Sequence, residues 1–355
     1  MKNMEGIGLR TGLIYDAAYL DHETHGCPES PARVKHTYEI LKIAGMLEKL
    51  VTIKPRPATV EEVSLVHLPA YIERVKEFSK RGGGSFGNNT TGSPETFETA
   101  LLAAGGTLSA VEAVLEGRVE SAFALVRPPG HHARPGQAMG YCFFNNAAIA
   151  ARYAIKRYGL SRVLIIDWDE HHGNGTEEIF YSDPSVLYFS VHRDWSYPGT
   201  GQAAKAGDGE GKGFNINVPL PKRSGDADYE HVFRRILRPV ALAYRPQLVL
   251  VSAGFDAHRD DLIGQMSLTP YGYMALTGIV CEIATCCGGA LAAVLEGGYN
   301  PGALAESVFA VLHTMAGWDA GSSSQPADEK PVKVNVMGII EEVVKIHGSY
   351  WDFGF

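Results

Sequence analysis

Short uninterrupted runs of aliphatic and β-branched residues recur along the chain, most of them followed closely by polar residues or glycine. Runs of this length without polar alternation are typical of parallel strands that are buried on both faces. They predict strands at residues 13–15, 122–126, 163–167, 186–190, 248–252 and 292–295, with a further strand-like run at 214–219.

Between these runs, apolar residues recur three and four positions apart, which is the period of an amphipathic helix. This spacing predicts helices at 31–44, 93–115, 145–158, 226–244, 269–287 and 301–315. Ser93 followed by Pro94 predicts the N-cap and first position of the second of these helices. Strands that alternate with helices indicate an α/β fold with a mostly parallel sheet covered on both faces.

The length of 355 residues allows one large domain or two, and the lack of an internal repeat favours one. We expect a single catalytic domain over residues 1–355, with its core at about 12–317. Residues 318–330 predict a loop, because 321–329 read GSSSQPADE. Residues 331–355 predict a final helix, from about 332 to 347, and an aromatic tail that docks on the domain.

Composition narrows the classes of partner. The net charge is −8, which gives no support for binding to nucleic acid or to a membrane surface. We see no apolar run near the roughly 18 residues of a membrane span, and the N-terminus lacks the apolar core of a signal peptide. The five cysteines lack metal-site spacing and predict reduced thiols in a cytoplasmic protein.

Two polar stretches carry candidate metal ligands. Residues 166–175 read IDWDEHHGNG and residues 252–258 read SAGFDAH, and each follows a predicted strand. In open α/β sheets, ligands bind at the carboxyl ends of the strands. Asp169 and His171 are two apart, so on a strand they share one face, and Asp256 adds a third ligand. Three such ligands with an open position suit a catalytic Zn²⁺, or Fe²⁺ or Co²⁺, whereas capping carboxylates at a strand end are the alternative.

Two further stretches carry candidate catalytic groups. His131 and His132 follow a Pro-Pro-Gly turn after the strand at 122–126, and they suit general acid and base roles, with metal ligation as the alternative. Tyr299 follows the last strand after a glycine pair. Its hydroxyl could donate to an oxygen that gains negative charge, although a packed aromatic in a turn is the competing interpretation.

Taken together, these stretches resemble the histone deacetylase superfamily, in particular class II histone deacetylases and the acetylpolyamine amidohydrolases. The resemblance spans about 12–317 and is carried by CPESPARV (27–34), RPPGHHA (127–133), GYCFFNN (140–146), DWDEHHGNG (167–175), SAGFDAH (252–258) and LEGGYN (295–300). It implies an arginase-like, three-layer α/β/α fold around a mainly parallel eight-stranded sheet.

The resemblance also implies cofactors and roles. Zn²⁺ would be held by Asp169, His171 and Asp256. A structural K⁺ would use the side chains of Asp167 and Ser190 with the main-chain carbonyls of Asp169 and His171. The remaining roles fall on five side chains: His132 as general base and later acid, His131 paired with Asp167, Asn174 orienting His132, and Tyr299 as oxyanion donor. The implied reaction is hydrolysis of an N-acetyl amide.

The sequence departs from the usual family pattern at the tunnel and beside the metal. Glu170 stands between two ligands where an apolar residue is usual. Its buried charge needs either a partner, for which an arginine or lysine is expected, or a raised pKa. The substrate tunnel is expected to be lined by Gly140, Tyr141, Tyr197, Ile263 and Asn89, where Asn89 replaces a rim Asp, the two Tyr replace Phe, and Ile263 replaces the Glu of polyamine-specific relatives.

The substrate is therefore either acetyl-lysine or a small acetylated amine such as a polyamine, and a homo-oligomer is possible. Two other functions compete with the deacetylase. An arginase-type enzyme with two Mn²⁺ would need more ligating Asp and His residues than 169–173 supply. A catalytically silent acyl-amine binding protein would be expected to lose a ligand, the His pair or Tyr299.

Overall fold

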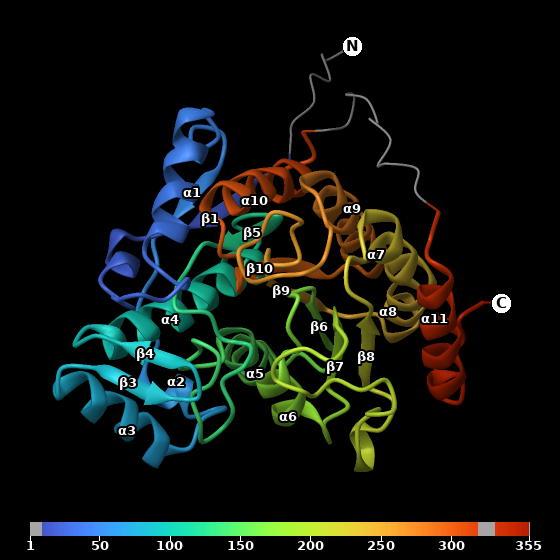
Figure 1. Cartoon of the computed structure of the whole chain (residues 1–355), viewed down its shortest axis with the longest axis horizontal. Helices are drawn as coiled ribbons and strands as arrows, with labels where there is room; N and C mark the ends of the chain where they lie inside the picture. The colour runs from blue at the N-terminus through green and yellow to red at the C-terminus, as the bar shows by residue number, and fades with distance from the viewer. Residues whose placement is uncertain (1–8, 319–330, 355) are drawn as a thin grey trace.

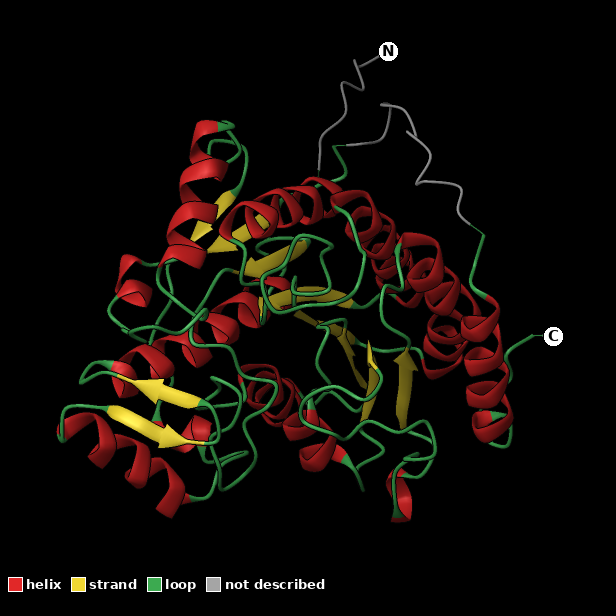
Figure 2. Ribbon diagram, viewed as in Figure 1, coloured by secondary structure: helices red, strands yellow, loops and turns green. Residues whose placement is uncertain are grey.

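A parallel eight-stranded sheet forms the centre of the molecule (Figures 1 and 2). The computed structural model describes residues 9–318 and 331–354. The strands lie in the order β2 (Val51–Ile53), β1 (Thr11–Ile14), β5 (Ser121–Ala124), β10 (Ala290–Leu295), β9 (Leu248–Ala253), β6 (Val163–Asp167), β7 (Val186–Arg193) and β8 (Asn215–Leu220). Every neighbouring pair is parallel, so the carboxyl ends of all strands meet at one edge.

Two helical layers cover the sheet, as the α/β/α prediction requires (Figure 1). One contains α1 (Ala32–Ile43), α7 (Asp226–Val232), α8 (Arg238–Tyr244), α9 (Pro270–Cys287) and α10 (Pro301–Met315). The other contains α4 (Thr96–Leu115), α5 (Asn146–Tyr158) and α6 (Asn174–Phe180). The predicted fold class is confirmed.

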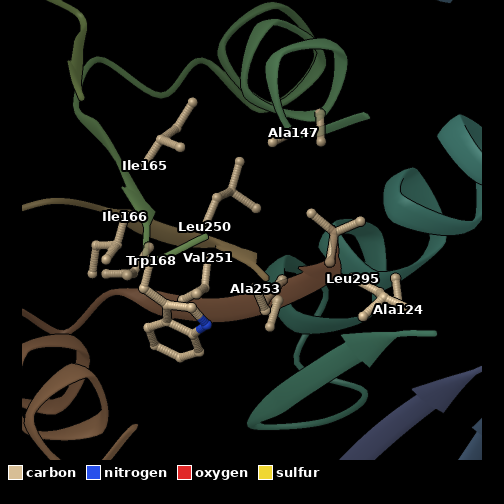
Figure 3. Close-up of a cluster of buried hydrophobic side chains, with 14 of the residues drawn as sticks. Ala124, Ala147, Ile165, Ile166, Trp168, Leu250, Val251, Ala253 and Leu295 are labelled. Carbon is tan, nitrogen blue, oxygen red and sulfur yellow. The ribbon is translucent and has the colours of Figure 1, made fainter. Parts of the chain in front are cut away.

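The strands are apolar on both faces because both faces are covered. Leu250 and Val251 of β9 point to opposite sides of the sheet, and each is at most 2% exposed. Figure 3 shows part of this core, with residues from β5, β6, β9, β10 and α5 and one residue, Trp168, directly after β6. The labelled side chains are Ala124, Ala147, Ile165, Ile166, Trp168, Leu250, Val251, Ala253 and Leu295. The continuous apolar runs in the sequence reflect this double burial.

Several elements were not predicted. These are β2, the hairpin of β3 (Gly84–Gly87) and β4 (Thr90–Gly92), α2 (Val60–Val63), α3 (Pro69–Lys80), α6, and the 3₁₀ turns at Ala17–Leu20 and Gly209–Gly211. The predicted helix at 226–244 is divided by a π-helical turn at Phe233–Leu237, which ends two residues before Pro239. Proline cannot donate a backbone hydrogen bond, which accounts for the local change of helix type.

The predicted start of the helix at 93–115 was wrong. α4 begins at Thr96, and Ser93 lies outside it. The Thr96 hydroxyl accepts a hydrogen bond from the Ser93 backbone N–H at 2.7 Å, while the Ser93 hydroxyl accepts from the Glu95 N–H at 3.3 Å. Side-chain bonds to the local backbone therefore form a turn here, and the helix starts after it.

The end of the chain packs against the sheet layer. α11 (Val334–His347) lies beside β8, and the Trp351 indole N–H donates to the Gly213 carbonyl at 2.7 Å. The predicted loop at 318–330 lies outside the described residues, apart from Trp318.

One described helix, α4, has the length and hydropathy of a membrane span, which the sequence analysis did not anticipate. Most of its apolar window is buried inside the protein, where it packs against α5, β5 and β10. A buried core helix of a globular protein meets the same two criteria, so this helix is accounted for by the core.

Replacing Leu250 with Ala should lower the free energy of unfolding by about 3 kcal/mol, because it leaves a cavity between the two helical layers. Ile43 is 82% exposed, and Ile43→Ala should change the same quantity by less than about 0.5 kcal/mol. Urea unfolding followed by circular dichroism measures both. Equal losses in the two variants would contradict the placement of β9 in the core.

Candidate metal centre and active site

Three buried side chains meet at the carboxyl edge of the sheet. Asp169 and His171 lie in the loop after β6, and Asp256 lies in the loop after β9. Nδ1 of His171 is 2.8 Å from Asp256 Oδ2 and 3.3 Å from Asp169 Oδ1. The expectation that Asp169 and His171 share a strand face was wrong, because β6 ends at Asp167; the loop brings them together instead.

The charges of this group favour a metal ion. Burial, and then the nearby negative charge of Asp169, raise the pKa of Asp256 to about 8. Two buried carboxylates side by side are unfavourable unless a cation lies between them. Suitable donor atoms of Asp169, His171 and Asp256 lie within 4.8 Å of one another, which is a separation that one ion can bridge. The residues therefore fit a divalent metal.

Backbone contacts hold both carboxylates in place. The Gly297 N–H donates to Asp169 Oδ2 at 2.8 Å, and the Glu170 N–H donates to Asp256 Oδ1 at 2.8 Å. A Cβ on Gly297 would lie 2.5 Å from both ligand carboxylates, and one on Gly254 would lie 2.1 Å from Asp169 Oδ2. Only glycine permits such close approach of the backbone at these two positions.

The two adjacent histidines have opposite electrostatic environments. Burial disfavours the charged form of His131, but the carboxylates of Asp167 and Asp169 outweigh it and raise its pKa to about 10. Nδ1 of His131 lies 3.0 Å from Asp167 Oδ2. Burial, and then the positive charge of His131, lower the pKa of His132 well below its ordinary value. At neutral pH, His131 is therefore cationic and His132 is neutral.

A cavity of about 170 Å³ opens onto His132 and His171. The structure brings all five predicted tunnel residues and Tyr299 to its wall; the lining residues are Asn89, His132, Gly140, Tyr141, His171, Tyr197, Ile263 and Tyr299. The ring of Tyr197 stands edge-on to His132, with 5.1 Å between the ring centroids. Burial raises the pKa of Tyr299 well above 10, so its hydroxyl stays protonated.

The β3–β4 hairpin forms part of the cavity mouth. Its two-residue turn, Asn88-Asn89, has φ of 50° and 56°, a left-handed conformation that asparagine tolerates. The carbonyls of Asn88 and Asn89 accept from the N–H groups of Gly140 and Tyr141 at 3.0 and 3.3 Å. A Cβ on Gly140 would lie 2.4 Å from the His132 ring. The hairpin thus fixes one wall of the cavity against the histidine.

The residues predicted for K⁺ are adjacent and buried. Asp167 and Ser190 are paired across β6 and β7 in the sheet register. Asp167 already accepts from the Tyr188 hydroxyl at 2.9 Å, and Ser190 Oγ lies 2.8 Å from His192 Nδ1. K⁺ at this position stays a prediction.

Residues 27–315 match the histone deacetylase domain family. The chain belongs to the histone deacetylase family. It is 39% identical to a probable deacetylase of Archaeoglobus fulgidus, covering 96% of this chain and 98% of that protein. It is 42% identical to the human polyamine deacetylase HDAC10 over 84% of this chain and 46% of that protein. With histone deacetylase HDA1 of Saccharomyces cerevisiae, the identity is 36% over 97% of this chain and 53% of that protein.

The solved structures agree with this assignment. The crystal structure of the HDA15 HD domain superposes with a TM-score of 0.90 at 36% identity, covering 97% of this chain and 95% of that chain. The resemblance stated from the sequence is therefore confirmed, and the chain is an enzyme of the deacetylase type. It spans nearly the whole of the archaeal relative but only about half the length of HDAC10 and HDA1.

A buried ionic cluster under this deacetylase site was missed by sequence reasoning. Glu29 binds Arg127 through two hydrogen bonds of 2.8 and 2.9 Å and Arg33 through one of 3.0 Å. Arg33 in turn donates to the Gly298 carbonyl and lies 5.1 Å from the Tyr299 ring centroid. Glu29 and Arg33 are four residues apart, but Arg127 and Gly298 are far from them in sequence, so only the fold reveals that the cluster supports the loop that carries Tyr299.

Glu296 is a second buried acid that the sequence did not single out. Its carboxylate accepts from the backbone N–H groups of Gly130 and His131 at 2.6 and 3.0 Å, and from the Ser252 hydroxyl at 3.1 Å. Burial dominates the balance of effects on Glu296 and raises its pKa to about 7. Glu296 therefore joins the end of β10 to the loop that carries His131 and His132.

The expected partner of Glu170 is Arg193. The Glu170 side chain is fully buried, and its Oε1 lies 2.6 Å from Arg193 Nε. Glu170 extends toward the loop at 265–266 and does not join the metal-binding group. Both alternatives given for this carboxylate are met, because Arg193 is a cationic partner and burial also raises the pKa of Glu170 above its ordinary value.

Asp256→Asn should weaken Zn²⁺ binding by more than about 100-fold, because the loss of groups that merely support a ligand already costs 10–100-fold. Asp260 lies in the same loop with a side chain that is 62% exposed, so Asp260→Asn should bind Zn²⁺ like the native protein. Titration calorimetry on the metal-free proteins compares the three dissociation constants. Native affinity in Asp256→Asn would rule out this metal centre.

Proposed function

We propose that this protein is a zinc-dependent deacetylase that hydrolyses an N-acetyl amide on a primary amine, releasing acetate and the free amine. The observation that supports this most directly is that a neutral His132, a protonated Tyr299 and His171 of the metal-fitting group line one cavity.

Asp169, His171 and Asp256 would hold Zn²⁺, and His171 lines the cavity that would admit water and the acyl group. When bound, Zn²⁺ supplies Lewis acidity toward that oxygen and lowers the pKa of a bound water. Family membership supports a metal-dependent reaction, and two carboxylates with one imidazole are an N/O donor set that zinc accepts. The structural K⁺, at Asp167 and Ser190, is part of the same proposal.

His132 is the general base. Its Nδ1 lies 2.8 Å from the side-chain carbonyl oxygen of Asn174, which can only accept, so Nδ1 carries the proton. Nε2 is then free to take a proton from the attacking water and later to deliver it to the leaving amine. In this proposal Asn174 fixes that tautomer and thereby orients His132.

His131 holds its proton throughout. Its hydrogen-bonded partner Asp167 and the nearby Asp169 keep it cationic. The fixed positive charge of His131, whose ring centroid is 4.1 Å from that of His132, disfavours a second proton on the His132 ring. The charge of His131 therefore keeps Nε2 of His132 unprotonated at neutral pH, so that it can accept a proton.

Tyr299 stabilises the transition state. Its hydroxyl is held at the cavity wall as a donor and can bind the oxygen that gains negative charge. Tyr141 and Tyr197 line the wall with it and would contact the alkyl chain that carries the acyl group.

The relatives' names give the substrate class as an acetylated amine. HDAC10 is named a polyamine deacetylase and HDA1 a histone deacetylase. The cavity lining contains Asn89 and Ile263 but no carboxylate, so neither a rim acid nor a cation-selecting acid favours one carrier. We therefore propose both N-acetylpolyamines and acetyl-lysine as candidate substrates. The proposal also includes a cytoplasmic location and no binding to nucleic acid.

Tyr299→Phe should lower kcat for a natural N-acetyl amide by about 10²–10³, because it removes one oxyanion donor. The assay measures acetate release by the Zn²⁺-loaded protein from N-acetylputrescine, N-acetylspermidine, acetyl-lysine peptides and free acetyl-lysine. Tyr271 is 52% exposed on α9, and Tyr271→Phe is the matched control with unchanged kcat. Native turnover in Tyr299→Phe, or no turnover by the native Zn²⁺ form, would refute the proposal.

Asn174→Asp should move the acid limb of the kcat/KM profile to higher pH by about one unit or more, since a carboxylate partner stabilises the imidazolium. Neutral His132 is the active form, and its lowered pKa places the native limb below pH 6.5. Asn174→Asp raises the pKa of His132, so His132 becomes protonated and inactive at a higher pH than in the native protein. An unshifted limb in the variant would show that another group is the base.

A further inference from the structure

Glu170 joins the metal-binding loop to a second loop of the cavity. Its Oε2 accepts from the backbone N–H groups of Gln265 and Met266 at 2.6 and 3.1 Å. Its Oε1 lies 2.6 Å from Arg193 Nε. The carboxylate, itself fully buried, therefore holds two backbone donors and one arginine at once.

Arg193 extends the same connection to a third loop. Its backbone N–H donates to the Glu170 carbonyl at 2.8 Å. Its guanidinium donates to the Gln265 side-chain oxygen at 3.0 Å and to the Ser196 hydroxyl at 2.6 Å. Ser196 directly precedes Tyr197, whose ring lines the cavity next to His132.

Two carboxylates share the amides of the loop at 263–266. The N–H groups of Ile263 and Gly264 donate to Asp261 Oδ1 at 2.8 and 2.9 Å, and the next two N–H groups donate to Glu170. Asp261 also accepts from the Tyr299 N–H at 2.6 Å. Four consecutive amides therefore fix the loop that presents Ile263 to the cavity, and half of them depend on Glu170.

There is little free space for this loop to relax into. A Cβ on Gly264 would lie 1.7 Å from the carbonyl oxygen of Asp256 and 2.7 Å from Glu170 Oε2. The loop thus packs directly on the backbone of a metal-binding residue, and its position is set by the carboxylate next to it.

We propose that Glu170 is a positioning residue that acts with Arg193 to fix the Tyr197 and Ile263 walls of the cavity, and thereby determines which acylated amines the enzyme accepts. The specificity part rests on the proposed function. Loss of Glu170 should widen substrate choice while leaving the metal and the general base in place.

The first test is amide hydrogen exchange, which needs no activity. In Glu170→Leu, exchange at Gln265 and Met266 should accelerate by about tenfold or more, because a hydrogen bond to a charged acceptor is lost at each amide. The amides of Ile263 and Gly264, held by Asp261, are the internal reference. Glu170→Gln keeps a carbonyl acceptor and should retain most of the protection of these two amides from exchange. It is the second variant to measure if Glu170→Leu folds poorly.

The matched control is Asp183→Leu. Asp183 also binds an arginine, Arg152, and a backbone N–H, that of Ser185 at 2.9 Å, but at the opposite edge of the sheet. Asp183→Leu also removes a carboxylate that binds an arginine and a backbone N–H, and it should leave exchange at Gln265 and Met266 unchanged.

The second test measures discrimination. The ratio of kcat/KM for acetyl-lysine to that for butyryl-lysine should fall toward one in Glu170→Leu, mainly through KM, with native zinc content and kcat within about threefold. Discrimination between a linear and a branched hydroxamic acid should weaken in the same way, so that the ratio of their two dissociation constants moves toward one. This binding measurement does not require hydrolysis. This second ratio separates a failure of the proposed function from a failure of this proposal.

Native exchange in Glu170→Leu would overturn the proposal, and so would accelerated exchange with native discrimination in both ratios. Loss of zinc in parallel with activity would also overturn it, because Glu170 would then act on the metal ligands. Asp183→Leu must keep the native ratios. If its ratios also fell toward one, the change in Glu170→Leu would reflect general destabilisation and the proposal would be overturned.

Discussion

The concentration of buried negative charge at the carboxyl edge of the sheet is the constraint on which the rest of the site depends. Four buried acids lie at the ends of neighbouring strands or in the loops that follow them: Asp167, Asp169, Asp256 and Glu296. Each needs a cation or a set of backbone donors, because an unpaired buried charge costs several kcal/mol. The protonated His131, the N–H groups of the glycine-rich loops and a divalent metal meet this need. The same charges keep His131 cationic and thereby leave His132 neutral.

The sequence was most informative where a strand and its ligands are contiguous. β6 and β9 were readable because they are buried on both faces and are uninterrupted apolar runs. Asp169, His171 and Asp256 follow those runs closely, so parallel strands predict that they converge. The resemblance then assigned the roles of His132, Asn174 and Tyr299. The fold places His132 and Tyr299 on the wall of one cavity, and it places Asn174 in contact with His132.

Elements outside this pattern were harder to predict. β3 and β4 are rich in glycine and polar residues and lack apolar alternation, although the Asn88-Asn89 pair is a recognisable hairpin signal. α3 begins with Pro69 and buries Tyr71, Ile72, Val75 and Phe78 at helical spacing, so its signal was present. Ser93 was wrongly taken as an N-cap because its hydroxyl serves a turn. The pairing of Glu29 with Arg127, 98 residues away, depends on the tertiary fold alone.

The central claim is that the Asp169, His171 and Asp256 group holds the metal on which amide hydrolysis depends. The most direct measurement is acetate release from N-acetylputrescine and an acetyl-lysine peptide as metal-free protein is titrated with Zn²⁺. The account predicts that turnover of at least one substrate rises linearly and reaches its maximum at one Zn²⁺ per chain. Turnover that is independent of metal content, or its absence from the stoichiometric Zn²⁺ form, would contradict it.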